Sequence, residues 1–468
     1  MQQTIAQRLV DFDHELKFDR IPREVVSKTK RLMLDTLGVC LGSTNLDFGK
    51  AAMTMVGGWG GALQSTIIGL PGKTSVHNAA FCNGILGHGQ DFDDTHTESV
   101  VHPSAALVPV ALAVGERGKR RTKDVLTGLI GGLEATIRLG LPALNKFHLR
   151  GFHTTSVCAT FGAAMIASKV GNLKQGQTLQ AVGIGGSFAS GLLECIPAKA
   201  EAKRLHAGWA GLSGIIAADL AQVGYTGPET VFEGKLGLYN SFLRGEPLDL
   251  DVIFEELGER WEVLNIRPKL YPCCHYLQAF LDCAAAMRRE HGVRPDQIVS
   301  IQCRVAKGAV NIVCEPWASK LNPKTGYDLR FSLPFAVAMM LTRGKAGISE
   351  FLPEVSDDPS IRKLMTKVSY SIDPNFSVKD MPGSIEVILI DGRKCSWEVP
   401  QVRGDTVNPI SEDEILEKFY ANTSFLGHST SSRIADRILS FDRHDNFDDL
   451  MDDLRASTHD STLNLVTA

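Results

Sequence analysis

The spacing of apolar residues predicts helices along most of the first 245 residues. Apolar positions recur at the three- and four-residue intervals of helices with one or more buried faces. One helix is expected to begin at Ile21-Pro22-Arg23-Glu24, with Pro22 in its first turn, and to end at Gly42. Further helices, rich in glycine and alanine, are predicted at residues 125–139, 156–170 and 205–223. Since a glycine in a helix costs up to about 1 kcal/mol against alanine, their repeated use indicates helices that approach one another closely.

The pattern changes between about residue 266 and residue 400, where strands are predicted among helices. Residues 299–305 alternate apolar and polar side chains, which is typical of a half-buried strand. Residues 367–372 are expected to form a second strand. Within residues 384–399, Asp391-Gly392 predicts the tight turn of a hairpin, because both residues tolerate a positive φ. With helices predicted at 277–288 and 333–342, this segment is expected to be an α+β unit with an antiparallel sheet.

Helices return after Asn408-Pro409. Ser411 and Glu414 form a capping box that marks a helix start, and a further helix is expected near residues 431–439. The simplest fold class is therefore mainly α with an inserted α+β domain. We expect a large all-helical domain built from both chain ends, residues 1–265 and 404–468, and a smaller lid domain with the sheet, residues 266–403.

Composition narrows the class of protein. The chain has 468 residues and a net charge of -4, with no clustered basic run, so a nucleic-acid partner is not expected. No apolar run approaches the roughly 20 residues that a membrane helix needs, and the charged N-terminus does not resemble a secretion signal. The ten cysteines include no Cys-x-x-Cys pair, which disfavours a zinc or dithiol site. We expect a cytoplasmic globular protein.

The segment Gly87 to Ala106, GHGQDFDDTHTESVVHPSAA, carries the densest chemistry of the chain. Its twenty residues hold three histidines and four acids between the apolar runs NAAFCNGIL and AALVPVALAVG. Titratable groups beside a core are costly unless they pair, bind a ligand or react. Proton-transfer chemistry is expected at such places. The alternative is a polar loop with solvated charges.

Further segments carry histidines and cations near helix starts and glycine- or proline-rich junctions. Together they would suit a substrate with several carboxylates, since Lys and Arg hold anions while His moves protons. Singly, each has an ordinary alternative: a lone lysine is usually at the surface, and a lone histidine is usually structural. The residues are His153 in GFHTTS, Lys203, Arg204 and His206 in KRLH, Lys269 in RPKLYPCCH and Arg330 in YDLRFS.

At these residues the chain resembles the MmgE/PrpD family. The matching segments follow the family's order: NGILGHGQDFDDTHTESVVHPSAALVPVALAVGE, GFHTTSVCATFGAA, KRLHAGWAGLSGIIAADLAQVGYTGP, RPKLYPCCHYLQAFLD and YDLRFSLPFAVAMML. The resemblance implies a homodimer whose subunits have a helical domain and an inserted lid. It also implies chemistry at the carbon α to a carboxylate, without a metal or an organic cofactor. The family's active-site positions fall on Asp91, Thr95, His102, His153, Lys203 and Lys269.

The resemblance suggests a role for each residue. Lys203 and Lys269 could neutralise the charge that develops on a carboxylate next to the reacting carbon. His102 and His153 could act as acid and base, and Asp91 could orient a histidine or assist proton transfer. We therefore expect His102, His153, Asp91, Lys203 and Lys269 to be catalytic, and Thr95, His88, His206, Cys274 and Arg330 to bind substrate.

The sequence departs from the family's pattern at three places that bear on the choice of substrate. Animal cis-aconitate decarboxylases carry a histidine where Cys274 stands, although a Cys-Cys pair occurs in the fungal enzymes. The 2-methylcitrate dehydratases have a tryptophan-containing loop where THTESVV stands here. Arg330 replaces the family's lysine, which keeps the charge but changes its geometry.

The function expected from this sequence is a lyase for a small di- or tricarboxylate. It would be a dehydratase or decarboxylase of substrates like 2-methylcitrate or cis-aconitate. An epimerase of a dicarboxylate such as iminodisuccinate is the alternative. Two more distant alternatives are a magnesium-dependent isoprenoid-synthase-like enzyme, suggested by the DDxxD pattern at Asp448, Asp449 and Asp452, and a helical scaffold without catalysis.

Overall fold

The computed structural model describes residues 3–198, 200–377 and 379–455, and divides the chain into two compact units. The larger unit comprises residues 1–89, 93–266 and 411–468, and the smaller comprises residues 90–92 and 267–410. The chain therefore enters the smaller unit twice, first for the three residues Gln90 to Phe92. Whether the predicted segments 1–265 with 404–468 and 266–403 behave as separate domains stays a prediction.

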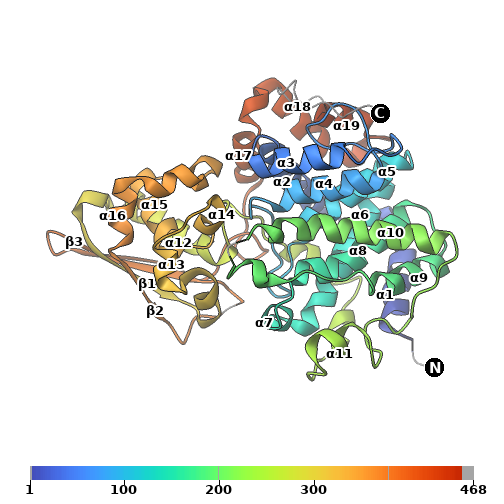
Figure 1. Cartoon of the computed structure of the whole chain (residues 1–468), viewed down its shortest axis with the longest axis horizontal. Helices are drawn as coiled ribbons and strands as arrows, with labels where there is room; N and C mark the ends of the chain where they lie inside the picture. The colour runs from blue at the N-terminus through green and yellow to red at the C-terminus, as the bar shows by residue number, and fades with distance from the viewer. Residues whose placement is uncertain (1–2, 199, 378, 456–468) are drawn as a thin grey trace. The chain divides into compact units, whose positions relative to one another are not determined.

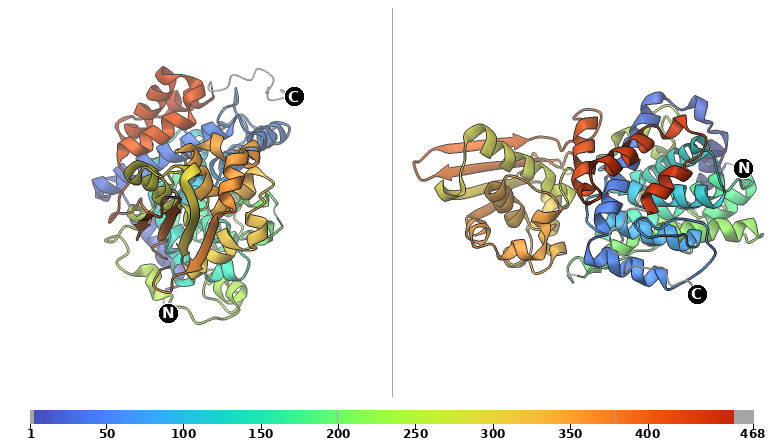
Figure 2. Two further views of the ribbon diagram at one scale, coloured as in Figure 1. Left: turned by 90° about the vertical axis from the view of Figure 1, so that its left-hand side faces the viewer. Right: turned by 90° about the horizontal axis from the view of Figure 1, so that it is seen from above.

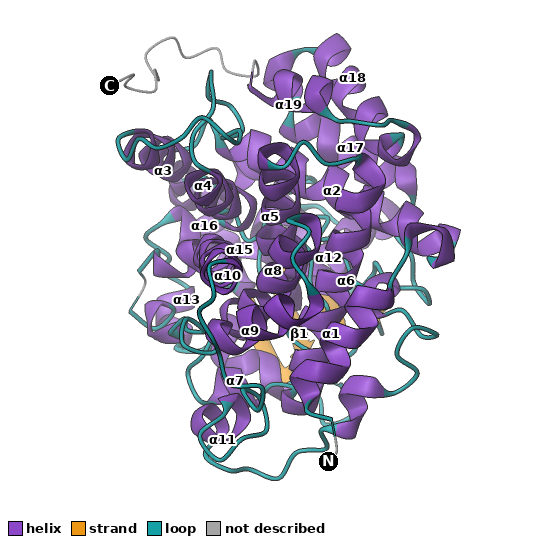
Figure 3. Ribbon diagram, turned by 90° about the vertical axis from the view of Figure 1, so that its right-hand side faces the viewer, coloured by secondary structure: helices purple, strands orange, loops and turns teal. Residues whose placement is uncertain are grey.

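The larger unit consists of helices and their connections, as the sequence pattern predicted (Figures 1 and 3). In the part of the chain that the structure describes, no helix combines the length and apolar character that a membrane crossing requires. The helices of this unit are α1 (Ile5–Glu15), α2 (Arg23–Ser43), α3 (Asp47–Gly57), α4 (Val76–His88), α5 (Pro103–Arg117), α6 (Thr122–Gly140), α7 (Lys146–Leu149), α8 (Thr154–Val170), α9 (Gln175–Gly185), α10 (His206–Gln222), α11 (Leu238–Leu243), α17 (Glu412–Asn422), α18 (His428–Leu439) and α19 (Asp448–Arg455).

Glycines bring the central helices α4, α8 and α10 into close contact. A Cβ added at Gly208 of α10 would lie 2.3 Å from the carbonyl oxygen of Phe81 in α4. One added at Gly214 would lie 2.4 Å from the Cβ of Ala163 in α8. Real atoms cannot approach so closely, so only glycine fits at these positions. The prediction that the helical glycines serve close packing is confirmed at these positions.

The C-terminal helices complete the larger unit. Ser411 caps α17 by accepting a hydrogen bond from the backbone N–H of Glu414, which confirms the predicted capping box. Helices α17 and α18 both pack on α2, and α18 in turn packs on α19. Both chain ends therefore contribute to one helical core, in agreement with the predicted fold class.

The smaller unit contains a sheet with helices on one face (Figures 1 and 2). Helices α12 and α15 cover this face, and strand residues of the opposite face are partly or fully exposed. Among the described residues the sheet has four strands in the order β2-β1-β3-β4. The elements are α12 (His275–His291), β1 (Ile298–Val305), α13 (Trp317–Lys320), α14 (Gly326–Leu329), α15 (Leu333–Arg343), α16 (Pro359–Met365), β2 (Val368–Ile372), β3 (Gly383–Leu389) and β4 (Lys394–Val399).

The sheet differs from the expected antiparallel one in a single pairing. Strand β1 pairs antiparallel with β3, and β3 with β4, but β1 pairs parallel with β2. The chain between β1 and β2 includes α15 and α16, which give it the length that a parallel crossover requires. Local alternation of apolar residues identified both strands but contains no information about their relative direction.

The turn between β3 and β4 also differs from the expected two-residue turn. Leu389 and Arg393 pair across it, so three residues, Ile390 to Gly392, form the loop. Gly392 has a φ of 85°, and Asp391 is not among the residues with positive φ. This is the three-residue hairpin in which glycine takes the left-handed position.

Candidate active site

The acidic and histidine-rich segment from Gly87 to Ala106 is buried. His88 and Asp93 are fully buried, and Asp94, Thr95 and His102 expose 8% of their surface or less. The alternative of a solvated polar loop is therefore wrong. The backbone is also strained, because Val100, a β-branched residue, has a φ of 55°. Burial of so many titratable groups in a strained segment is typical of functional sites.

Four histidines of the larger unit meet at the ends of four helices. His88 is the last residue of α4, His102 and His153 precede α5 and α8, and His206 is the first residue of α10. The ring centroids of His88, His102 and His153 lie 5.4 to 5.8 Å apart, and that of His206 lies 5.0 Å from His153. Three of the helix ends are N-termini, whose dipoles disfavour imidazolium and favour a bound carboxylate.

The surroundings of His102 identify its tautomer. Its Nδ1 lies 2.8 Å from the backbone carbonyl oxygen of Asp94 and 2.9 Å from Oγ1 of Thr95. A carbonyl oxygen can only accept a hydrogen bond, so Nδ1 donates and carries the hydrogen. The lone pair of the neutral ring is then on Nε2, which is the nitrogen that can take up a proton.

His88 is oriented by a carboxylate. Its Nδ1 lies 2.6 Å from Oδ2 of Asp93, and both side chains are fully buried. This is the usual way in which a carboxylate fixes the orientation of an imidazole. The carboxylate that contacts His88 is that of Asp93. The role of Asp91 in orienting a histidine, suggested by the sequence, stays a prediction.

His153 and His206 contact each other directly. Their Nδ1 atoms lie 3.0 Å apart, so one ring donates and the other accepts. Burial, together with the positive charge of Lys203, holds the pKa of His153 well below its usual range. Burial, followed by the charges of His88 and Lys203, lowers the pKa of His206 to about 3. His148, whose ring lies 5.8 Å from His153, has its pKa lowered to about 4 by burial and by Lys203. These histidines are therefore neutral near pH 7.

Lys203 supplies the positive charge of this histidine cluster. It lies in the turn before α10 and exposes 5% of its surface. An ammonium group surrounded by neutral imidazoles and helix N-termini makes this a positive environment. Such an environment suits a substrate carboxylate.

Several polar atoms of the cluster are buried and have no hydrogen-bond partner among the described residues. They are Nε2 of His88 and of His153, and the hydroxyls of Thr154 and Ser156 in the first turn of α8. Buried polar groups are nearly always satisfied, so such a concentration indicates a place where a polar ligand binds. The neighbouring hydroxyl of Thr155 accepts a hydrogen bond from the backbone N–H of His102 at 3.0 Å.

Asp94 is a further buried acidic group, and its backbone carbonyl contacts His102. Burial raises its pKa to about 7, since the hydrogen bond from the backbone N–H of Ser104 compensates only in part. The pKa of Asp35, in α2, is also raised by burial, although Lys418 lies 2.6 Å from its carboxylate. Asp94 can therefore hold a proton near pH 7.

Lys269 and Asp91 form a buried pair in the smaller unit. The ammonium of Lys269 donates to the backbone carbonyl of Asp91 at 2.9 Å and lies 3.4 Å from its Oδ1. Lys269 is fully buried, and Asp91 has a left-handed backbone with a φ of 53°. The pair holds the three-residue segment from Gln90 to Phe92 against the loop that follows Arg267.

Arg330 binds the same segment through its backbone. Its Nε donates to the carbonyl of Gln90 at 2.7 Å, and its NH1 donates to the carbonyls of Gly326 and Phe351. Its own carbonyl accepts from the backbone N–H of Cys274 at 2.9 Å. The guanidinium thus joins three chain segments, which a lysine could not do with the same geometry.

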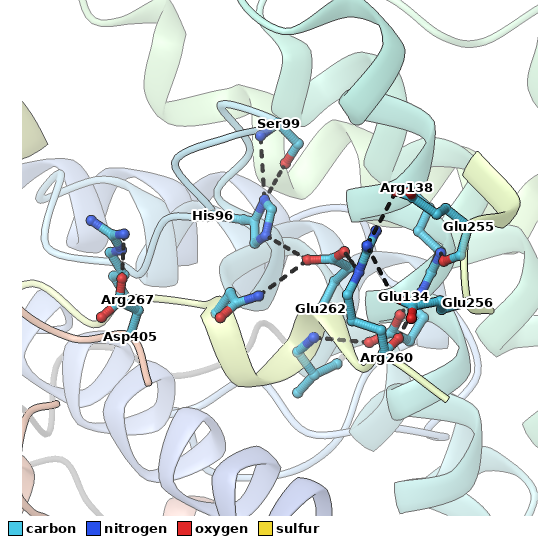
Figure 4. A network of polar contacts seen from close by, with 12 residues as sticks. His96, Ser99, Glu134, Arg138, Glu255, Glu256, Arg260, Glu262, Arg267 and Asp405 are labelled. Carbon is cyan, nitrogen blue, oxygen red and sulfur yellow. Dashed lines mark hydrogen bonds and ion pairs between the residues drawn. The ribbon is translucent and has the colours of Figure 1, made fainter. Parts of the chain in front are cut away.

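His96, the remaining histidine of the segment, has a structural role (Figure 4). Its Nδ1 lies 3.0 Å from Oγ of Ser99, and its Nε2 lies 3.3 Å from Oε2 of Glu262. Although burial opposes it, the interaction with His96 lowers the pKa of Glu262 to about 2. His96 joins the segment to the residues before the smaller unit.

The structure groups the predicted site residues in two sets. The larger unit brings together His88, Thr95, His102, His153, Lys203 and His206, and the smaller brings together Asp91, Lys269, Cys274 and Arg330. Sequence reasoning did not assign roles to Asp93 and Asp94. The five-residue spacing between His88 and Asp93, across a helix end, was the only signal for the first. Nothing in the sequence indicated the raised pKa of the second.

Two of the three aspartates in the DDxxD pattern, which suggested a magnesium enzyme, form ion pairs with arginines. Asp449 lies 3.4 Å from NH1 of Arg437, and Asp452 pairs with Arg455. Within the described ranges, no group of three His, Cys, Asp or Glu side chains is arranged to hold a metal ion.

Comparison with protein families identifies both parts of the chain. The MmgE/PrpD N-terminal domain matches residues 7–251, and the MmgE/PrpD C-terminal domain matches residues 271–442.

Curated relatives match over nearly the whole chain. Human cis-aconitate decarboxylase is 29% identical over 439 residues, covering 91% of this chain and 89% of its own. The cis-aconitate decarboxylase-like protein oryM of Aspergillus oryzae is 26% identical, covering 94% of each chain. The cis-aconitate decarboxylase of Aspergillus terreus is 23% identical, covering 94% of this chain and 93% of its own.

Proposed function

Because the chain belongs to the MmgE/PrpD family, we propose that it is a lyase for a small tricarboxylate of the cis-aconitate type, and that it releases CO2. The observation that carries this proposal is the cluster of buried histidines around Lys203. Such a cluster can bind a carboxylate and move a proton in the same place. The relatives named cis-aconitate decarboxylase support the choice of substrate and reaction.

The binding part of the proposal rests on positive charge. Lys203 would pair with one substrate carboxylate, and the N-termini of α5 and α8 would favour another. The hydroxyls of Thr154 and Ser156, which are buried without a partner among the described residues, would donate to carboxylate oxygens.

The chemical step requires one proton for each CO2 released. The bond between a carbon and its carboxylate breaks, and the electron pair forms a new double bond while the existing double bond shifts. The carbon at the far end of that shift takes a proton from a general acid. His102 and His153 are the proposed proton carriers, with Nε2 as the reacting nitrogen of each.

Asp91 and Lys269 are proposed to act as a pair. Oδ1 of Asp91 lies 3.4 Å from the ammonium of Lys269, so a substrate carboxylate that binds this lysine must share it with Asp91. Cys274, Arg330 and Thr95 are kept as proposed substrate-binding residues, and His88 and His206 as residues that touch the substrate or its proton carriers.

A second candidate is an epimerase for a dicarboxylate. The rings of His102 and His153 lie 5.8 Å apart, so one could remove a proton from a carbon while the other returns a proton to its opposite face. Dehydration of a 2-methylcitrate-like substrate would likewise begin with removal of a proton from a carbon.

A single NMR experiment separates these reactions. The purified protein would be incubated in D2O with cis-aconitate, citrate, 2-methylcitrate and iminodisuccinate in turn. We expect CO2 loss from cis-aconitate with one deuteron gained per molecule, and no such loss with Lys203→Met. Water loss or exchange without CO2 release would assign one of the alternatives. A lack of any turnover or exchange across all four compounds would overturn the proposal.

Light scattering on the same sample tests the proposed homodimer.

A further inference from the structure

One hydrogen bond joins the N-terminal ends of α5 and α8 in the larger unit. The backbone N–H of His102, the residue before α5, donates to Oγ1 of Thr155 at 3.0 Å. Thr155 is the second residue of α8 and is fully buried, and His153 immediately precedes this helix. The contact therefore links the backbone of one proposed proton carrier to a side chain two residues from the other.

We propose that Thr155 is a positioning residue that fixes the spacing of His102 and His153 for proton transfer. The inference rests on the proposed function and holds equally for the epimerase alternative, since both use these two rings to move protons. In the structure the two ring centroids lie 5.8 Å apart. The hydroxyl of Thr155 acts through the backbone of His102 and is not required to touch the substrate.

The amide of His102 requires an acceptor from outside its own helix. His102 has a φ of -103° and a ψ of 82°, so it precedes the helical part of the chain, and the first N–H groups of a helix have no partner within that helix. Burial then makes an external acceptor necessary, because buried backbone N–H groups are nearly always paired. Oγ1 of Thr155 supplies one from the neighbouring helix.

Two contacts hold His102, and they have different consequences. The carbonyl oxygen of Asp94, 2.8 Å from Nδ1, fixes the tautomer and the rotation of the ring. The hydroxyl of Thr155 instead fixes the backbone that carries the ring relative to α8. Loss of the hydroxyl would leave the tautomer unchanged and release the ring from its distance to His153. A misplacement of about 1 Å can lower a rate by about 10²-fold, because the reacting atoms no longer meet in the productive geometry.

The hydroxyls on either side of Thr155 differ from it. Those of Thr154 and Ser156 are buried without a partner among the described residues, whereas that of Thr155 is bonded to His102. Successive helix residues point about 100° apart, so the three side chains face different neighbours. The two outer hydroxyls are the proposed substrate contacts, and the middle one holds the site. Changes at these positions should therefore affect different kinetic constants.

The first test needs no substrate. Protein labelled with 15N-histidine has 13 histidine amides, and the signal of His102 is assigned with His102→Gln. Hydrogen exchange at this amide should be about 10-fold faster or more in Thr155→Val, since valine has the shape of threonine without the acceptor. Thr160→Val is the matched control, because this buried hydroxyl donates to the carbonyl oxygen of Ser156 within α8. Equal exchange of the His102 amide in wild type and Thr155→Val would overturn the inference.

The second test compares two pairs of side chains at position 155, and the members of each pair differ at the hydroxyl: threonine with valine, and serine with alanine. In Thr155→Val and Thr155→Ala, kcat should fall by about 10- to 10²-fold with KM changed by less than about 3-fold. Thr155→Ser should keep most of the wild-type kcat. The serine and alanine variants decide the matter if Thr155→Val does not fold. An equal loss of kcat in both would mean that the methyl group rather than the hydroxyl is required, and the inference would be wrong.

Two further variants separate positioning from binding and from stability. Thr154→Val should mainly raise KM, because its hydroxyl is a proposed substrate contact. Thr160→Val should leave kcat and KM of the folded protein unchanged, whatever its effect on thermal unfolding. If Thr155→Val raised KM and kept its kcat, Thr155 would be a substrate ligand and not a positioning residue.

The outcomes distinguish this inference from the proposed function. If the wild-type protein releases CO2 and Thr155→Val does so at the same rate, the function stands and the inference fails. If the wild-type protein turns over none of the four compounds, the function fails and the catalytic role of Thr155 fails with it. The contact between Thr155 and the His102 amide is then judged by hydrogen exchange alone.

Discussion

Nδ1 of His102 lies 2.8 Å from the backbone carbonyl oxygen of Asp94, and this contact determines which nitrogen of His102 can react. A backbone carbonyl cannot donate, so the hydrogen is on Nδ1 and the lone pair of the neutral ring is on Nε2. The main chain, together with Oγ1 of Thr95 at 2.9 Å from the same nitrogen, thus leaves the lone pair of the neutral ring on Nε2, where His102 can accept a proton.

His102→Ala should lower kcat by about 10²–10⁴-fold if His102 is a proton carrier. The matched control is His96→Ala, in the same segment, which removes the structural contacts to Ser99 and Glu262. The control should lower the melting temperature while the folded fraction keeps its kcat. Steady-state kinetics and thermal unfolding on both variants check this. A normal kcat in folded His102→Ala would remove it from the mechanism.

Lys269→Met should destabilise the protein by about 3–5 kcal/mol, because it leaves the buried carboxylate of Asp91 without its cation. In the double variant Lys269→Met with Asp91→Asn, the loss should be smaller than the sum of the two single losses. Urea unfolding of the four proteins gives the coupling energy. Additive losses would show that the two side chains do not stabilise each other.

Arg330→Lys should destabilise the protein by about 2–3 kcal/mol, because a lysine cannot satisfy the carbonyls of Gln90, Gly326 and Phe351 together. Arg343→Lys, in the same unit, changes an ion pair that is partly exposed and should cost about 0.5 kcal/mol or less. Urea unfolding measures both. If Arg330→Lys kept its stability but raised KM strongly, the residue would be a substrate ligand rather than a support of the loop.

Gly208→Ala should destabilise the larger unit by about 1–3 kcal/mol or more, since the new Cβ would lie 2.3 Å from the carbonyl oxygen of Phe81. Gly176→Ala, in the first turn of α9, is the matched control, because nothing lies within 4 Å of a Cβ there. The control should be neutral or stabilising by up to about 1 kcal/mol. Equal effects of the two changes on thermal unfolding would contradict the close contact of α4 and α10.

The lowered pKa of His148 should make the folded protein less stable in mild acid. Its pKa is about 4 in the folded state and near 6.5 in the unfolded chain, so between these values only the unfolded chain binds the proton. Stability from this group is complete above pH 6.5 and decreases by up to about 1.4 kcal/mol per pH unit as the pH falls toward 4.

The variant His148→Asn isolates this contribution. Buried acids such as Asp94, whose pKa is raised, have the opposite dependence and partly offset it in the wild type. The difference between the two proteins in the free energy of unfolding should therefore change with pH between 6.5 and 4, and remain constant above 7. A difference that is independent of pH would mean that the pKa of His148 is the same in the folded and the unfolded chain.

The sequence by itself determined the elements and the identity of most candidate residues. Apolar spacing located the central helices and strands within a few residues, because burial of one face requires a fixed period. The capping box at Ser411 and the glycine-rich composition of the central helices were also local features. The unusual density of histidines and acids between Gly87 and Ala106 indicated the site because such groups are costly to bury.

Only the tertiary structure decided which residue contacts which. His153 and His206 are 53 residues apart, and their pairing depends on how α8 and α10 pack. Asp93 contacts His88, whereas Asp91, two residues earlier, lies in the three-residue segment of the smaller unit and pairs with Lys269. The direction of β2 likewise follows from its crossover. Hydrogen bonds, pKa values and strand direction depend on neighbours distant in the chain, and a local pattern contains no information about them.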